Sequence, residues 1–229
     1  MRRSDLELVR ALPLFQHMAA SHFESLMKAA LLQKFPPRVV LVAEGDLPDF
    51  LHVVIEGTVE LFATHAGHET TIDMLPPVTT FILAAVIRDE VYLKSARTMT
   101  PSRVLMIPAE AVRDVFGRDA SFARAVVAEL AARYRGIVRA LKNQKLRSSV
   151  ERLASWVLQT DRRNGGSGRV PLAYEKRTLA SLLGMTPENL SRNLAILAEH
   201  GLATEGRHFT ITDRERLERF AVPSTLIDD

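Results

Sequence analysis

The sequence predicts an α+β fold in three consecutive parts, and three observations predict it. Short runs of branched and aromatic residues, separated by turn residues, fill residues 31–108. A stretch without proline extends from Asp119 to about Gln144, and two short helical patterns begin at Lys176. We therefore expect a mainly β domain over residues 1–118, a long helix over 119–145 and a mainly helical domain over 146–229.

The first domain is predicted to begin with helices and to continue as short strands. Residues 5–30 carry apolar side chains at helical spacing, in two pieces. From Leu31 onward, runs such as RVVLV, FLHVVIEG and TTFILAAV alternate with turn signals such as Pro36-Pro37. Many short strands at regular spacing indicate an antiparallel sandwich or barrel.

The long helix carries an apolar seam whose residues recur in alternating steps of three and four, the heptad spacing of a coiled coil. This seam predicts a two-fold dimer, and packing of the same stripe against the β-domain is the alternative. The residues expected at the dimer seam are Val127, Leu130, Tyr134, Ile137 and Leu141.

The last domain is predicted to hold two short helices joined by a tight turn and followed by a hairpin. A helix over residues 148–160, a glycine-rich loop and a short strand at residues 169–172 come first. Gly184 can end the next helix, since glycine accepts the left-handed conformation that a helix terminus needs. Thr186 then stands at an N-cap with proline after it, and residues 202–211 have the pattern of a hairpin wing.

The second of these helices has one apolar and one polar face. Arginine can bind guanine through two acceptors, glutamate can accept from cytosine, and serine can contact bases or phosphates. A solvated helix face is the alternative, but the helix, turn, cap and wing stand in register. We expect this helix to enter the major groove of double-stranded DNA. The expected DNA contacts are Thr186, Glu188, Asn189, Ser191 and Arg192, with Lys176, Arg177 and Arg207 beside them.

The formal net charge is only +3, so attraction to phosphate groups must come from local clusters of cations. The second half of the chain is rich in cations that can neutralise backbone phosphates, and a wet helix surface is the alternative for many of them. These cations are Arg133, Arg135, Arg139, Lys142, Lys145, Arg147, Arg152, Arg162, Arg163, Arg169, Lys176, Arg177, Arg192 and Arg207.

Several classes of protein are disfavoured by what the sequence lacks. Without cysteine there is no disulfide, no thiolate catalysis and no cysteine-ligated iron–sulfur cluster. No apolar run of about 18 residues or secretory leader occurs, which predicts no membrane contact and a cytoplasmic location. Because no phosphate-cradling glycine loop, metal-spaced histidine cluster or nucleophile motif occurs, we expect no catalytic residue, no metal and no enzyme.

A domain of short strands, a long helix and a winged helix-turn-helix, in that order, resemble the CRP/FNR family of bacterial transcription regulators over almost the whole chain. Residues 188–192, ENLSR, are similar to the E-x-x-S-R recognition element of its FNR branch. Pro187 stands where the CRP branch has a base-reading arginine. The alternative to DNA binding is a ligand-binding scaffold.

This resemblance implies a homodimer that reads an inverted repeat with TTGAT-like half-sites. Arg192 would read guanine, Glu188 the opposing cytosine and Ser191 a thymine. The resemblance also implies an antiparallel β-roll that is cyclic-nucleotide-binding-like and serves as sensor, with RNA polymerase as a partner. A role as an activator is expected, with repression left open.

The expected effector pocket departs from that of cyclic-nucleotide binders in the family, which carry a Gly-Glu pair and, ten residues later, an Arg-Ser pair. Aligning Phe81 with the family's strand phenylalanine puts Leu83 and Ala84 at the first pair and Lys94 and Ser95 at the second. Alanine cannot accept a ribose hydroxyl, and lysine cannot make arginine's two-pronged phosphate contact. A cyclic nucleotide is therefore disfavoured, although the last two residues can still hold an anion.

The apolar run at residues 81–86 is expected to line a pocket against the long helix, with ordinary core packing as the alternative. Its composition looks like that of the nitric-oxide-responding DNR and NnrR groups, some of which use haem. Haem needs an axial ligand, commonly histidine, and no single histidine stands out. The cofactor is therefore left open. The candidates in the sensor half are His17, His22, His52, His65 and His68.

Overall fold

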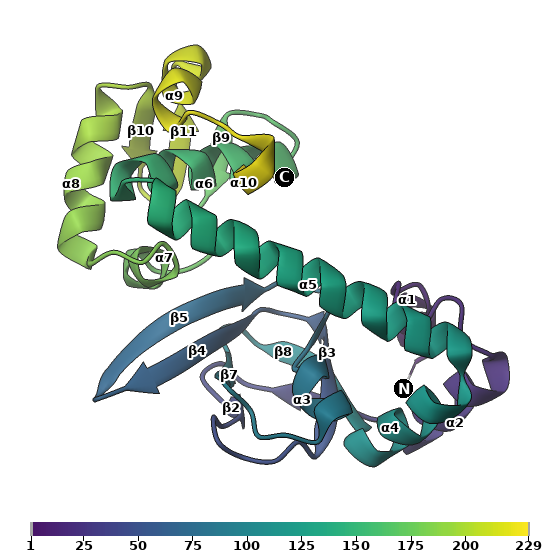
Figure 1. The fold of residues 1–229 in the computed structure, drawn as a ribbon. Coiled ribbons are helices and arrows are strands. Elements are labelled where there is room, and N and C mark those ends of the chain that lie inside the picture. The colour runs from purple at the N-terminus through teal and green to yellow at the C-terminus, as the bar shows by residue number, and fades with distance from the viewer. Residues whose placement is uncertain (1, 229) are drawn as a thin grey trace. The chain divides into compact units, whose positions relative to one another are not determined.

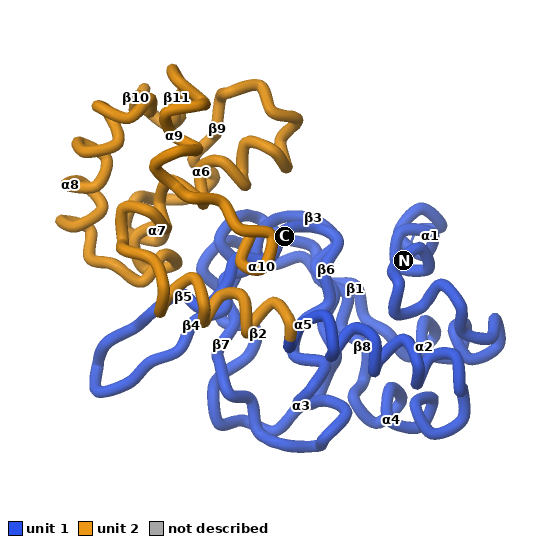
Figure 2. Tube along the Cα trace, turned by 45° about the horizontal axis from the view of Figure 1, so that its top comes forward, with its two compact units in different colours: residues 1–134 blue, residues 135–229 orange. Residues whose placement is uncertain are grey.

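The computed structural model describes residues 2–228, which divide between Tyr134 and Arg135 into two compact units. Figure 2 draws the first unit in blue and the second in orange. Each unit has its own hydrophobic core. Among the described residues, no helix is long and apolar enough to cross a membrane. Functional boundaries at residues 118 and 145 stay a prediction.

The first unit contains two four-stranded antiparallel sheets, with strand orders β1-β8-β3-β6 and β2-β7-β4-β5 (Figure 1). Together with the helices described below, they confirm the predicted α+β fold. The strands are β1 (Leu31–Phe35), β2 (Val40–Val42), β3 (Phe50–Glu56), β4 (Val59–His65), β5 (His68–Leu75), β6 (Thr79–Phe81), β7 (Ser95–Thr98) and β8 (Ser102–Pro108).

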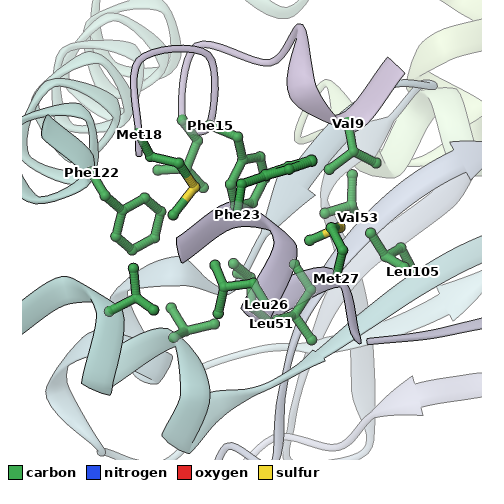
Figure 3. Packing of buried hydrophobic residues seen from close by; sticks show 14 of the residues in the cluster. Val9, Phe15, Met18, Phe23, Leu26, Met27, Leu51, Val53, Leu105 and Phe122 are labelled. Atoms are coloured by element: carbon green, nitrogen blue, oxygen red, sulfur yellow. The ribbon is translucent and has the colours of Figure 1, made fainter. Parts of the chain in front are cut away.

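Helices cover one side of this β-roll. Phe15 lies between two rings, with centroids 6.1 Å from Phe23 and 6.0 Å from Phe122 (Figure 3). This cluster joins the N-terminal helices to the start of the long helix. The helices of this part are α1 (Arg3–Arg10), α2 (Ala20–Ala29), α3 (Leu83–Arg88) and α4 (Ala109–Arg118).

Two expectations about local structure need correction. The two helical pieces expected over residues 5–30 are α1 and α2, but the first piece is shorter than expected, because residues 11–18 form turns. The run TTFILAAV is not one strand, since β6 ends at Phe81 and Ile82 adopts the left-handed conformation with φ 60°. The following residues form α3, which buries Leu83 and Val86 at helical spacing.

The long helix α5 (Ala120–Leu146) begins and ends within two residues of the predicted bounds. Asp119 caps it, because its Oδ1 accepts hydrogen bonds from the amides of Ser121 and Phe122, each at 2.9 Å. The helix belongs to both units, since the division between them falls inside it.

The second unit is mainly helical, with a three-stranded antiparallel sheet of order β10-β11-β9. Its core combines the apolar faces of its helices with Phe209 of the sheet. The predicted wing is the β10–β11 hairpin, and α10 was not expected from the sequence. The elements are α6 (Ser149–Arg163), β9 (Arg169–Pro171), α7 (Lys176–Leu182), α8 (Pro187–Ala198), β10 (Leu202–Glu205), β11 (His208–Ile211), α9 (Arg214–Ala221) and α10 (Thr225–Asp228).

Candidate nucleic-acid interface

A tight turn joins α7 to α8 and sets the start of the second helix. Gly184 occupies the left-handed region with φ +62°, which a side chain rarely adopts. The amide of Met185 donates to the carbonyl of Ala180 at 2.9 Å and closes the end of α7. The sequence therefore predicted this helix terminus correctly.

Helix α8 begins as its N-terminal residues predict. Thr186 Oγ1 accepts a hydrogen bond from the amide of Asn189 at 3.2 Å, and Pro187 takes the first helical position. In this first turn, the pKa of Glu188 is lowered, first by a hydrogen bond from its own backbone amide and then by the Thr186 side chain. The carboxylate is thus an ionised acceptor at neutral pH, which suits a contact with the amino group of cytosine.

The polar face of α8 is exposed. Glu188, Asn189, Ser191 and Arg192 all lie on the surface. Ser191 Oγ donates to the carbonyl of Pro187 at 3.1 Å, while within residues 2–228 the guanidinium of Arg192 donates no hydrogen bond. A donor fork and a carboxylate therefore stand side by side, one helical turn apart, with their polar atoms available to a base pair.

The opposite face of α8 is fixed in the core by Leu190 and Leu197. Asn193 is also buried there, and its Nδ2 donates to Ser149 Oγ at 3.0 Å and to Met185 Sδ at 3.4 Å. These contacts orient the helix on α6. The buried position of Asn193 was not expected from the sequence, although it lies three residues after one buried leucine and four before the other.

Two of the cations assigned to phosphate contacts are buried, and that expectation is wrong for Arg147 and Arg152. Arg152 donates to three carbonyl oxygens: Leu183 at 2.9 Å, Gly184 at 3.2 Å and Arg147 at 2.8 Å. It satisfies carbonyl groups at the ends of α5 and α7, which lack intrahelical partners. Burial lowers the pKa of Arg152, but the group stays charged at any physiological pH.

The three flanking cations expected to contact DNA are exposed. Lys176 and Arg177 form the first turn of α7, where nearby phosphate groups are also favoured by the helix N-terminus. Arg207 lies in the turn of the wing, and its Nη2 donates to the carbonyl of Leu172 at 3.4 Å. The wing and the two helices thus offer cations beside the polar face of α8.

The five residues expected at the effector pocket have different environments. Phe81 and Leu83 are buried, each in a different core cluster, and Ala84 is exposed. Ser95 Oγ accepts a hydrogen bond from the amide of Glu44 at 3.0 Å. Lys94 is half-buried.

Charges of both signs lie around Lys94. Burial lowers the pKa of Lys94, Asp73 raises it, and the charge of Arg133 lowers it further. Arg133 is held by Glu129 at 3.0 Å and by the carbonyl of Thr80 at 2.8 Å. Two cations and two carboxylates therefore interact in this part of the first unit.

Of the five sensor-half histidines, His52 is the most deeply buried, at 2% exposed. Its ring stacks on Phe81 with centroids 5.1 Å apart, and neither nitrogen has a hydrogen-bond partner among the described residues. Burial lowers its pKa to about 4, against the opposing effect of the Phe50 carbonyl. His52 is therefore neutral at physiological pH.

Two family models match the chain. The Crp-like helix-turn-helix domain matches residues 151–220, and the cyclic nucleotide-binding domain matches residues 32–119. The first match includes both short helices and the wing, and the second includes all eight strands of the β-roll apart from the first residue of β1.

Curated relatives match over most of their length. The CRP-like cAMP-activated global transcriptional regulator of Mycobacterium tuberculosis is 26% identical over 221 residues, which are 94% of this chain and 99% of the relative. The cyclic AMP receptor protein of Thermus thermophilus is 28% identical over 196 residues, 85% of this chain and 89% of the relative.

A solved structure, FixK2 from Bradyrhizobium japonicum, shares the fold with a TM-score of 0.74 at 21% identity, covering 86% of this chain and 99% of that one. The homologues are transcriptional regulators and not enzymes. The chain belongs to the CRP/FNR family of DNA-binding transcription regulators.

Proposed function

We propose that the protein is a homodimer that reads an inverted repeat with TTGAT-like half-sites through α8 of each protomer. The observation that carries this proposal is the exposed set of Glu188, Ser191 and Arg192 on a helix whose start is capped and whose other face is buried. In this arrangement Arg192 donates to guanine, Glu188 accepts from the paired cytosine, and Ser191 contacts thymine. The phosphate backbone of the DNA is contacted by Thr186, Asn189, Lys176, Arg177 and Arg207.

The dimer is supported by exposed apolar side chains on α5. Tyr134 is 68% exposed and Ile137 66%, and Val127 and Leu141 are also exposed by more than half. Leu130 differs, because it packs against the core of the first unit. Burying such a side chain contributes about 1.5–3 kcal/mol, so a second α5 gains by covering this row. Two-fold pairing also places two α8 helices to bind half-sites about 34 Å apart.

We further propose that the first unit binds an anionic effector near Lys94 and Arg133. The positive charges of Lys94 and Arg133 repel each other, which supports the binding of an anion, and the matched domain model is that of cyclic-nucleotide binding. The expectation against a cyclic nucleotide finds no support in the relatives, one of which is named as cAMP-activated. cAMP is therefore the first ligand to test.

Haem is the second ligand to test, by adding it to the purified protein and recording an absorption spectrum for a Soret band. RNA polymerase as a partner, a role as an activator and a cytoplasmic location stay predictions.

Fluorescence anisotropy tests the DNA proposal. A labelled duplex with two TTGAT half-sites in inverted repeat is compared with a duplex of the same composition and scrambled order, at several salt concentrations. We expect tighter binding of the repeat, and an affinity for both duplexes that falls with salt. The titrations are repeated with cAMP alone and with haem alone. Equal affinity for the two duplexes in every arm contradicts the proposed reading of sequence.

A further inference from the structure

A histidine is buried in the β-roll of the first unit without a hydrogen bond to either ring nitrogen. His52 belongs to β3, is 2% exposed and stacks on Phe81 with ring centroids 5.1 Å apart. The ring of Phe50 meets it edge to face, with centroids 6.3 Å apart. Among the described residues neither nitrogen has a hydrogen-bond partner. Because a buried polar group without a partner costs free energy, its presence in this core calls for an explanation.

The protonation state of His52 shows which partner is lacking. Burial lowers its pKa to about 4, so at physiological pH the neutral ring has one N–H donor and one lone-pair acceptor. The carbonyl of Phe50 acts on the ring, and as an acceptor it suits only the nitrogen that carries the proton. The other nitrogen has no donor within residues 2–228. A ligand that satisfies this nitrogen must therefore bring an N–H or O–H group.

His52 lies close to the charges proposed above to bind an anion. It pairs with Phe81 in the register of β3 and β6. The carbonyl of the preceding residue, Thr80, accepts a hydrogen bond from Arg133 Nη2 at 2.8 Å. The charge of Arg133 in turn lowers the pKa of Lys94. The histidine and the two cations are thus connected through the short strand β6.

The backbone that follows β6 is strained. Ile82 has φ 60° and Asp89 has φ 54°, and these two residues flank α3 at its start and its end. A left-handed conformation is rare for any residue other than glycine, and rarer still for a β-branched one. Such strain is common at ligand clamps and switch regions. Since α3 packs beside β3, a shift of α3 that lets Ile82 leave this conformation releases strain next to His52.

We propose that His52 selects the effector by accepting a hydrogen bond from an amino or hydroxyl group on a flat ring whose anionic group is held by Lys94 and Arg133. The base of cAMP carries such an amino donor. The aromatic rings of Phe50 and Phe81 beside the histidine suit a flat ring. The ligand enters as α3 shifts. This role of His52 rests on the proposed anionic effector, and it adds the group that recognises the uncharged end of that effector.

Isothermal titration calorimetry with two ligands tests the selection. One ligand is cAMP, and the other is its analogue without the amino group of the base, so that both carry the same phosphate. We expect the unsubstituted protein to bind cAMP about tenfold more tightly, the effect of one hydrogen bond to a buried group. His52→Phe keeps an aromatic ring without nitrogen and should bind the two ligands equally. The matched control His65→Phe, at an exposed site, should keep the preference.

A lysine variant separates the role of His52 from the proposed anion site. Lys94→Ala should weaken the binding of both ligands by the same factor, because both carry the phosphate. If Lys94→Ala does so while His52→Phe keeps the preference for cAMP, the anion site stands and the role of His52 is refuted. Absence of binding of either ligand to the unsubstituted protein also refutes it. If His52→Phe does not fold, His52→Leu removes the same nitrogens in a smaller side chain and is measured in its place.

Discussion

Acidification from pH 7 to pH 4 is predicted to destabilise the first unit through His52. In the unfolded chain this histidine takes up a proton near its ordinary pKa of 6.5, whereas in the folded protein burial lowers the pKa to about 4. The unfolded state therefore binds more protons between these values, so the free energy of unfolding falls as the pH falls. This difference between the two pKa values corresponds to about 3 kcal/mol in the free energy of unfolding, and the whole of it is lost below pH 4.

Urea unfolding at pH 7, 5.5 and 4 measures this loss, with His52→Leu as the test variant. Leucine removes the titrating group and the two buried nitrogens without partners, so the variant should lose about 3 kcal/mol less than the unsubstituted protein over this range. His65→Leu, at an exposed site, is the matched control and should keep the full loss. If His52→Leu keeps the same pH dependence as the control, the account of His52 is wrong.

Three further predictions concern other parts of the chain. Burial raises the pKa of Asp119, but hydrogen bonds, first from His22, outweigh burial and lower the pKa to about 2. The contribution of Asp119 to the free energy of unfolding is therefore present above about pH 4 and is lost toward pH 2. Asp119→Asn should therefore lower the melting temperature at pH 7 and not at pH 2; an equal effect at both values argues against this. Ile137→Asp should shift the protein toward monomers in sedimentation velocity, and an unchanged dimer speaks against the seam. Thr186→Ala should cost about 1 kcal/mol in urea unfolding, while Thr186→Ser restores the cap; no difference between them contradicts the capping role.

The sequence predicted most reliably what local chemistry determines. The cap at Thr186, the left-handed Gly184 and the bounds of α5 follow from residue types and spacing within a few positions. The polar face of α8 could be predicted in the same way, because exposure follows from helical periodicity once the helix is placed.

Roles that depend on distant partners could not be predicted in this way. Arg147 and Arg152 lie among other cations in the sequence, and only their partners distinguish them from surface charges. Asn193 is polar at a buried position, because it pairs with Ser149 on another helix. In TTFILAAV, β propensity competes with the burial of Leu83 and Val86, and tertiary packing decides for a helix.

A double-mutant cycle measures whether Arg192 reads a guanine. Affinity is measured for the unsubstituted protein and Arg192→Ala, each on the inverted TTGAT repeat and on the repeat with its G·C pairs replaced by A·T. We expect Arg192→Ala to weaken binding by about 1–3 kcal/mol on the intact repeat and by almost nothing on the altered one. Arg163→Ala, which removes an exposed cation outside α8, should affect both duplexes equally. An equal loss of affinity on both duplexes for Arg192→Ala would mean that this side chain does not read the guanine.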